Sequence, residues 1–88
     1  MELLAFTWSP NPKLFRGITP QYQFVDTLPL IELLRDCCKN VEIYPELTLQ
    51  GNIHYHGKIT IKDKIKWFKS VLPKLKYNGF VCIKEMGS

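Results

Sequence analysis

Two stretches near the middle of the chain alternate between apolar and polar residues, and a short glycine-containing segment joins them. The first reads VEIYPELTL (41–49) and the second IHYHGKITI (53–61), with QGN between them. Alternation with a period of two is the pattern of a strand that buries one face and exposes the other. A connection this short makes the two strands antiparallel neighbours in a hairpin. The hairpin restricts the chain to folds with an antiparallel sheet that is covered on one side.

The segments before the hairpin predict a strand and then a helix. We expect a strand over 2–9, bounded by a Pro-Asn-Pro breaker, and a long connection over 10–26. Apolar residues at helical spacing, after a Thr or Asp cap, predict a helix over about 27–38. Pro29 would then fall in the first turn, where a proline is tolerated.

The segments after the hairpin predict a second helix and a last strand. The helix is expected to begin near Asp63 and to end or kink at Pro73. Its buried residues are expected to be Ile65, Phe68 and Leu72. The last strand is expected over 79–86.

This β-α-β-β-α-β order predicts an α+β fold. With short connections and right-handed crossovers, it gives an antiparallel sheet with both helices on one face, as in the ferredoxin-like and RNA-recognition-motif-like sandwiches. The other face of the sheet is left open. A length of 88 residues favours a single domain spanning 1–88.

Composition favours a soluble, intracellular, globular protein. Hydrophobic residues make up 45% of the chain and aromatic residues 12%, as in folded domains. No apolar run approaches the roughly 18 residues of a membrane span, and the first residues lack the features of a signal peptide. We therefore expect no membrane partner. The three cysteines fit neither a zinc motif nor a disulfide framework, and we expect buried free thiols.

The net charge of +4 is unevenly distributed along the chain. Residues 1–50 carry 4 basic and 6 acidic side chains, whereas residues 51–88 carry 8 basic and 2 acidic side chains. A basic half favours a polyanionic partner such as nucleic acid. A solvated helix face accounts for the same lysines equally well.

The only histidines, His54 and His56, flank Tyr55 in the second hairpin strand. Because this strand buries its isoleucines, both histidines are expected on the open face and Tyr55 in the core. A three-residue loop would place Glu46 opposite His56 and diagonal to His54, and any odd loop length keeps Glu46 on the histidine face. Two imidazoles and a carboxylate suit Mn, Fe, Co, Ni or Zn better than Ca. Two surface histidines without a role are the alternative.

Several segments, taken in order, resemble the N-terminal domain of the HUH replication initiators (Rep proteins) of circular single-stranded DNA viruses and related plasmids. The segment FTWSPNP (6–12) is similar to the first motif of that family, of the F-T-x-x-x-P kind. The segment HYH (54–56) matches its histidine-hydrophobe-histidine motif. Glu46 stands where the family keeps its third metal ligand. The resemblance covers essentially the whole chain, including the expected order of strands and helices.

The resemblance implies a metal-dependent endonuclease and nucleotidyltransferase that starts rolling-circle replication. It implies that Glu46, His54 and His56 bind Mn or Mg, and that the ion polarises the scissile phosphate of single-stranded or hairpin origin DNA. A tyrosine attacks and leaves a 5′-phosphotyrosine link and a free 3′-OH. Such a protein acts in the host nucleus if it comes from a eukaryotic virus and in the cytoplasm if it comes from a plasmid. The full-length protein could oligomerise through regions outside these residues.

The chain departs from the family at the nucleophile. The Tyr-x-x-Lys motif of the family lies on a helix after the last strand, and we expect this chain to stop before that helix. The 88 residues are therefore expected to be inactive in cleavage. A literal Tyr-x-x-Lys runs from Tyr55 to Lys58, but Tyr55 is rejected as the nucleophile because it is expected in the core.

Candidate DNA contacts come from the open face and from the first motif. Lys58 continues the histidine row and could meet a backbone phosphate, although an ordinary exposed lysine is an equal alternative. Trp8 and Phe80 could stack on bases, but aromatic residues in strands are more often core. The candidate set is Trp8, Asn11, Lys13, Tyr44 and Lys58.

Two other classes of protein compete with this interpretation. A non-catalytic single-stranded nucleic-acid-binding module of the RNA-recognition-motif kind would have the same sheet. However, the last strand, GFVCIKEM, lacks the aromatic spacing of the RNP1 motif of that family. A cupin-like metalloenzyme would use a similar histidine pair. It needs a glutamate shortly after the pair, where this chain has GKITIKD, and more strands than 88 residues supply.

Overall fold

The computed structural model describes residues 3–11 and 20–86. The strands are β1 (Leu3–Pro10), β2 (Cys38–Leu47), β3 (Ile53–Ile61) and β4 (Gly79–Glu85). They form one antiparallel sheet in the order β2-β3-β1-β4, so β2 and β4 are its edges. The helical elements are α1 (Pro20–Glu32), α2 (Leu34–Cys37), α3 (Lys64–Lys66), the π-helical turn η2 (Trp67–Val71) and α4 (Leu72–Tyr77).

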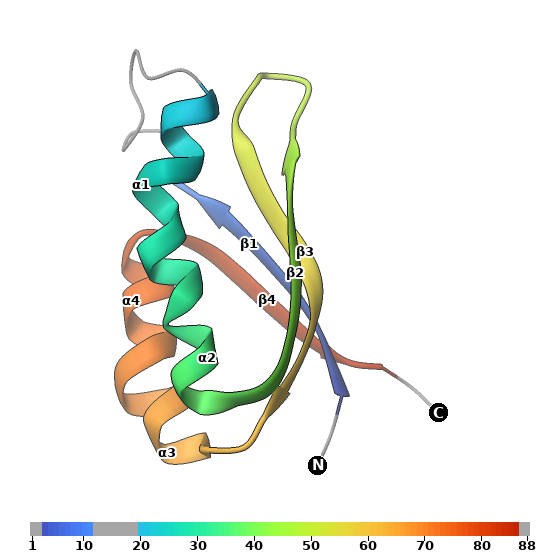
Figure 1. The fold of residues 1–88 in the computed structure, drawn as a ribbon, viewed down its shortest axis with the longest axis vertical. Coiled ribbons are helices and arrows are strands. Elements are labelled where there is room, and N and C mark those ends of the chain that lie inside the picture. The colour runs from blue at the N-terminus through green and yellow to red at the C-terminus, as the bar shows by residue number, and fades with distance from the viewer. Residues whose placement is uncertain (1–2, 12–19, 87–88) are drawn as a thin grey trace.

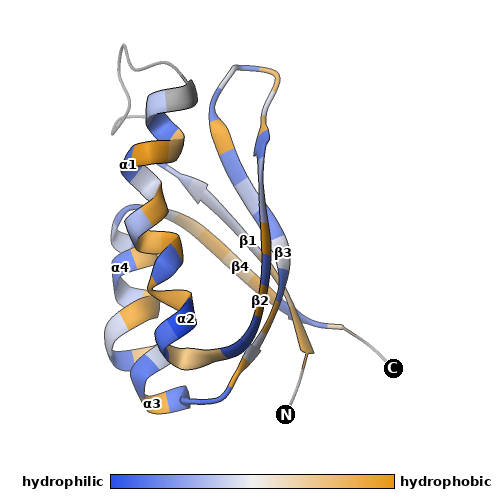
Figure 2. Ribbon diagram, in the orientation of Figure 1, coloured by the Kyte–Doolittle hydropathy of each residue, from blue (hydrophilic) through white to orange (hydrophobic). Residues whose placement is uncertain are grey.

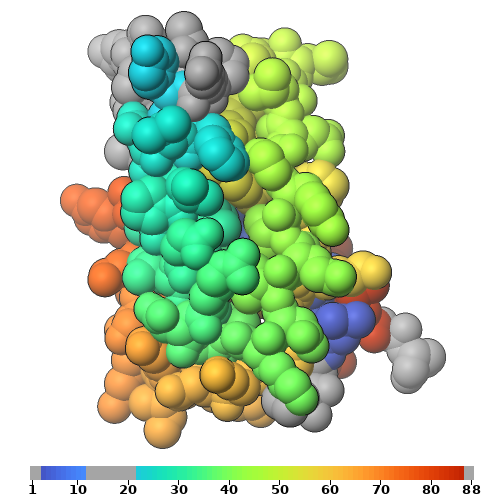
Figure 3. Space-filling view, in the orientation of Figure 1, coloured from blue at the N-terminus to red at the C-terminus, as the bar shows by residue number. Residues whose placement is uncertain are grey.

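All the helices pack on the same face of the sheet, and the other face is open (Figure 1). The predicted α+β fold is therefore confirmed, and the strand order is that of a ferredoxin-like sandwich. The space-filling view shows α1 and α2 lying alongside the edge strand β2 (Figure 3). In the part of the chain that the structure describes, no helix combines the length and the apolar character needed to cross a membrane.

The first helix begins earlier than predicted. It starts at Pro20, so residues 20–26 are helical rather than part of a connection, and residues 12–19 lie outside the described ranges. A proline is well suited to the first helical position, because the N–H that it lacks would have no partner there. Pro29 consequently lies inside α1 and not in its first turn. The chain then turns at Leu33 before it continues as α2.

The second helical segment buries a different face from the one predicted. Ile65 and Phe68 are 69% and 62% exposed, and the buried residues are Trp67, Val71 and Leu75. These buried residues recur at every fourth position, so they lie along one side of the helix, and Ile65 and Phe68 lie off that side. The expectation that Ile65 and Phe68 are core residues is therefore wrong.

A π-helical turn precedes Pro73. The backbone N–H of Leu72 donates to the carbonyl of Trp67, five residues back. A proline in a regular helix lacks its hydrogen bond, and its ring crowds the carbonyl four residues before it. The wider turn gives Pro73 room, so the helix continues through it instead of ending.

Trp8 and Tyr55 lie at the centre of the core. Their rings stack with centroids 5.8 Å apart, and both side chains are buried. The indole N–H of Trp8 donates to the carbonyl of Leu75 in α4 at 2.9 Å. The hydroxyl of Tyr55 lies 2.6 Å from Oγ1 of Thr27 in α1. α1 and α4 are thus each attached to the sheet by one buried aromatic side chain. Hydrophobic residues recur along α1, α2 and β4 around these two side chains (Figure 2).

Gly57, directly after the histidine pair, lies where β2 and β3 approach closely. A Cβ atom at this position would overlap the carbonyl oxygen of Glu42 and lie 2.9 Å from Cα of Ile43. Both obstacles are backbone atoms, which cannot rotate away. Glycine is therefore required at position 57 because no side chain fits between the two strands.

The substitution Gly57→Ala is expected to lower the free energy of unfolding by about 3 kcal/mol, because the strands must separate to admit one methyl group. Urea denaturation followed by circular dichroism measures the change. Gly51→Asn is the matched control: Gly51 has φ of 80°, and a Cβ atom added there would have no neighbouring atom within 4 Å. Asparagine tolerates this backbone conformation. Equal unfolding midpoints for Gly57→Ala and the wild type would contradict the steric argument.

Cys37 and Cys38 are buried side by side where α2 meets β2, with their Sγ atoms 3.7 Å apart. All three cysteines are free thiols, and Cys82 is half-buried on β4. Burial raises the pKa of both neighbouring thiols above the ordinary value of 9.0, and that of Cys38 reaches about 12. The expectation of buried free thiols is confirmed for this pair.

These raised pKa values predict that the protein loses stability in alkali. Above pH 9 the unfolded chain releases thiol protons that the folded chain keeps, so the free energy of unfolding falls as the pH rises. We expect a loss of about 1 kcal/mol from Cys38 between pH 9 and pH 10. Urea denaturation across this range measures it. Cys38→Ala should make the dependence shallower, whereas a slope identical to that of the wild type would refute the prediction.

Candidate metal centre

Strand β3 presents its histidines to the open face and its tyrosine to the core. His54 and His56 are half-buried, and their rings stack with centroids 5.8 Å apart and planes inclined by 22°. Tyr55 between them is only 1% exposed. The alternation expected from the sequence is confirmed, and it brings both imidazoles to one place on the surface.

The hairpin loop is longer than predicted but still odd in length. Leu47 pairs with Ile53, so the loop covers 48–52, and the expected pairing of Leu49 with Ile53 is wrong. Strand pairing ends at Leu47 because the loop forms a turn of its own. In this turn the N–H of Gly51, at positive φ, donates to the carbonyl of Thr48 at 2.9 Å. An odd loop preserves the faces of both strands.

Glu46 is therefore on the same face as the histidines, as predicted, but its pairing with the two histidines is the reverse of the predicted one. It lies directly opposite His54 and diagonal to His56, the reverse of the expected arrangement. Its carboxylate nevertheless reaches the diagonal ring, with Oε2 2.7 Å from Nε2 of His56. The carboxylate and the two imidazoles thus form one cluster across β2 and β3.

Ser9 of β1 joins this cluster, and the sequence interpretation missed it. Its Oγ lies 3.0 Å from Nδ1 of His54. The alternation of β1 puts Ser9 on the face opposite Trp8, but alternation does not give the register in which β1 pairs with β3. That register, with Trp8 opposite Tyr55, brings Ser9 to the histidine.

The chemistry of this donor set fits a divalent ion. Imidazole nitrogen and carboxylate oxygen suit Mn, Fe, Co, Ni and Zn. Because Ser9 engages Nδ1 of His54, Nε2 is the nitrogen left to ligate, and such hydrogen bonds orient metal-binding histidines. In this conformation, no three His, Cys, Asp or Glu side chains within 3–11 and 20–86 converge closely enough to hold a metal. Glu46 contacts His56 directly instead.

Two of the predicted DNA contacts lie beside the cluster. Tyr44 is 59% exposed and directly opposite His56. Lys58 is exposed on the same face of β3, opposite Glu42. Both side chains are exposed on the face that carries the histidines.

Trp8 does not lie on the open face, and its assignment as a DNA contact is wrong. It is fully buried, because the alternation of β1 puts it on the helix side together with Phe6. Asn11 is exposed at the end of β1, and its N–H donates to the carbonyl of Asn78 at 2.9 Å. Lys13 lies outside the described residues. Phe80 on β4, opposite Ser9, is exposed on this part of the sheet.

Comparison with protein-family models, with curated proteins and with solved structures finds no match. The geometry of the cluster itself is therefore the basis for assigning a function.

Tyr55 is excluded as a nucleophile at the histidines. Its hydroxyl points to Thr27, which in turn donates to the carbonyl of Gln23 at 2.7 Å. Because Thr27 uses its proton there, Tyr55 is the donor of the bond between them. Burial raises the pKa of Tyr55. A buried, neutral phenol that faces a helix has a structural role.

The substitution Tyr55→Phe is expected to lower the free energy of unfolding by about 1 kcal/mol, the typical net value of one hydrogen bond. Thr27 keeps its bond to the Gln23 carbonyl, so no buried donor is left unpaired. Urea denaturation measures the change, with Tyr44→Phe as the exposed control that leaves stability unaltered. A Tyr55→Phe protein as stable as the wild type would show that this bond does not hold α1 to the sheet.

Proposed function

We propose that this chain is the metal-binding domain of a Rep-type HUH endonuclease, which nicks and rejoins single-stranded DNA at a rolling-circle origin. The observation that carries the proposal is the contact of 2.7 Å between Glu46 and His56, beside His54, on the open face of the sheet. The ferredoxin-like order of strands and the segment FTWSPNP agree with it.

In this proposal, each polar residue of the cluster has a defined task. His54, His56 and Glu46 hold a divalent ion, Mn or Mg, which when bound neutralises charge on the phosphoryl oxygens of the DNA. The hydroxyl of Ser9 fixes the orientation of the His54 ring. Lys58 lies two positions beyond His56 on the same face and binds a neighbouring phosphate. Tyr44 provides an aromatic surface for a base.

The attacking group in this proposal is a tyrosine hydroxyl from outside the described residues. Its oxygen forms a bond to phosphorus while the bond from phosphorus to the 3′ oxygen breaks. The phenol loses its proton and the 3′ oxygen takes one up to become the free 3′-OH, and the new phosphotyrosine bond conserves the bond energy for rejoining. The residues described here then bind and orient the DNA but do not cut it. The protein works in the host nucleus if its source is a eukaryotic virus and in the cytoplasm if its source is a plasmid.

Manganese is expected to stabilise the protein. A ligand at one hundred times its Kd stabilises the folded state by about 2.7 kcal/mol, so MnCl2 should raise the melting temperature in differential scanning fluorimetry. His54→Ala, His56→Ala and Glu46→Gln should each abolish the rise. Glu42→Gln is the matched control, since Glu42 lies on the same strand and face but opposite Lys58. The Glu42→Gln protein should show the same rise in melting temperature as the wild type.

Two results would reject the proposal. The first is a folded wild-type protein whose melting temperature responds to neither Mn nor Mg. The second is metal-independent binding of single-stranded RNA that the histidine substitutions leave unchanged, which would favour the RNA-recognition-motif-like module.

A further inference from the structure

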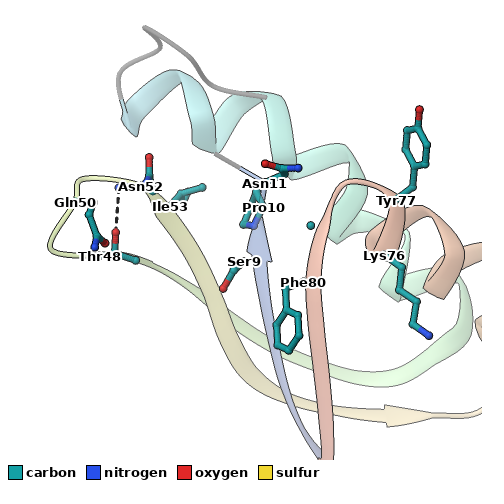
Figure 4. Close-up of a pocket in the computed structure, with 11 residues that line it drawn as sticks. Ser9, Pro10, Asn11, Thr48, Gln50, Asn52, Ile53, Lys76, Tyr77 and Phe80 are labelled. Atoms are coloured by element: carbon teal, nitrogen blue, oxygen red, sulfur yellow. Dashed lines mark hydrogen bonds between the residues drawn. The ribbon is translucent and has the colours of Figure 1, made fainter. Parts of the chain in front are cut away.

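The open face continues from the histidines into a pocket of about 420 Å³. The pocket lies where the end of β1, the loop between β2 and β3, the end of α4 and the start of β4 meet (Figure 4). Ser9 lines this pocket and also contacts His54 at 3.0 Å. The pocket and the histidine cluster are therefore adjacent and share a residue.

Phe80 lies in the same row of the sheet as the histidine cluster. Glu46 is opposite His54, Ser9 is bonded to His54, and Phe80 is opposite Ser9. Neighbouring strands are about 4.8 Å apart, so Phe80 lies roughly 10 Å from His54 along the row. Its side chain is 71% exposed and points to the same side as Ser9 (Figure 4). A nucleotide whose phosphate lies at the histidines can place a flanking base over this ring.

The other residues that line the pocket suit a nucleobase. Gln50 and Asn52 have amide side chains, which offer both donors and acceptors to the edge of a base. Lys76 is exposed at the rim and provides positive charge for a backbone phosphate. None of the described residues that line the pocket is acidic. An aromatic face, amides and a lysine are the combination that single-stranded nucleic-acid sites use.

We propose that this pocket binds one unpaired base of the DNA strand whose neighbouring phosphate lies at Glu46, His54 and His56. Phe80 stacks on the base, Gln50 and Asn52 contact its edge, and Lys76 binds the backbone that leaves the pocket. This assignment rests on the proposed function and adds to it. The domain then binds the DNA at two points, the phosphate at the histidine cluster and the neighbouring base in the pocket. Because Phe80 is mostly exposed, its replacement leaves the fold intact.

The test compares two fluorescein-labelled oligomers in the presence of MnCl2, by fluorescence anisotropy. One is dT12, and the other is a 12-unit abasic deoxyribose-phosphate tract of the same charge. Phe80→Ala is expected to weaken binding of dT12 by about 5- to 150-fold, the range for the loss of one stacked base. It should leave the weaker binding of the abasic tract unchanged. Phe80→Trp should retain the affinity for dT12.

Two control variants separate stacking from general surface effects. Phe68→Ala removes a similarly exposed phenylalanine from the helical side of the molecule and should bind dT12 as the wild type does. Lys76→Ala should weaken binding of dT12 and of the abasic tract by the same factor, because a phosphate contact does not depend on the base.

The outcomes distinguish the pocket from the function on which it rests. Wild-type affinity of Phe80→Ala for dT12, or an equal loss on both oligomers, overturns the base pocket and leaves the metal-dependent domain standing. Tighter binding of rU12 than of dT12, with the same dependence on Phe80, overturns the assignment to DNA. A wild-type protein that binds neither DNA oligomer overturns the proposed function itself.

Discussion

The inward position of Tyr55 is the constraint on which the rest of the structure depends. Its ring stacks on Trp8, and its hydroxyl donates to Thr27 across the interface between the sheet and α1. Successive side chains of a strand point to opposite faces, so a buried Tyr55 forces His54 and His56 outward together. A slip of one residue in β3 would bury both imidazoles and expose the phenol. The core and the histidine cluster are therefore two consequences of one register.

α1 and α4 are attached to the sheet by directional bonds as well as by apolar contact. Gln23 accepts from the backbone N–H of Ile53 at 2.9 Å, and Trp8 donates to the carbonyl of Leu75 near the end of α4. Among the described residues, no buried side-chain nitrogen or oxygen lacks a partner. An unpaired buried polar group costs about 1–3 kcal/mol, so alternative placements of either helix are disfavoured. This matters in a chain of 88 residues, whose core is small.

The features that follow from the alternation of side chains along a strand could be predicted from the sequence. The features that depend on contacts between elements distant in the sequence could not. Alternation alone placed His54, His56 and Glu46 on one face, and this placement is correct although the predicted loop length was wrong. The outward position of Ile65 and Phe68 follows from the burial of Trp67, Val71 and Leu75. Both sets of residues have helical spacing, and only packing against the sheet decides which of them faces the core.

Sequence interpretation failed in a different way in β1. Trp8 and Ser9 are consecutive, so one of them must face the core, and the bulkier indole does so. That choice is clear only once the stack on Tyr55 is known. The contact of Ser9 with His54 needs the register between β1 and β3 as well, which alternation within either strand does not supply.

The position of β2 at the edge of the sheet has a consequence for how the molecule meets other chains. An edge strand offers unpaired main-chain groups to any passing strand, which is a route to aggregation. In β2 this edge carries Pro45, next to Glu46 and opposite Tyr55. Proline is accommodated at a sheet edge with its nitrogen turned from the neighbour, so an incoming strand meets one donor fewer. Pro45 thus helps to prevent a second chain from adding a strand to the sheet at β2. The open face is left for a ligand that does not pair with strand edges.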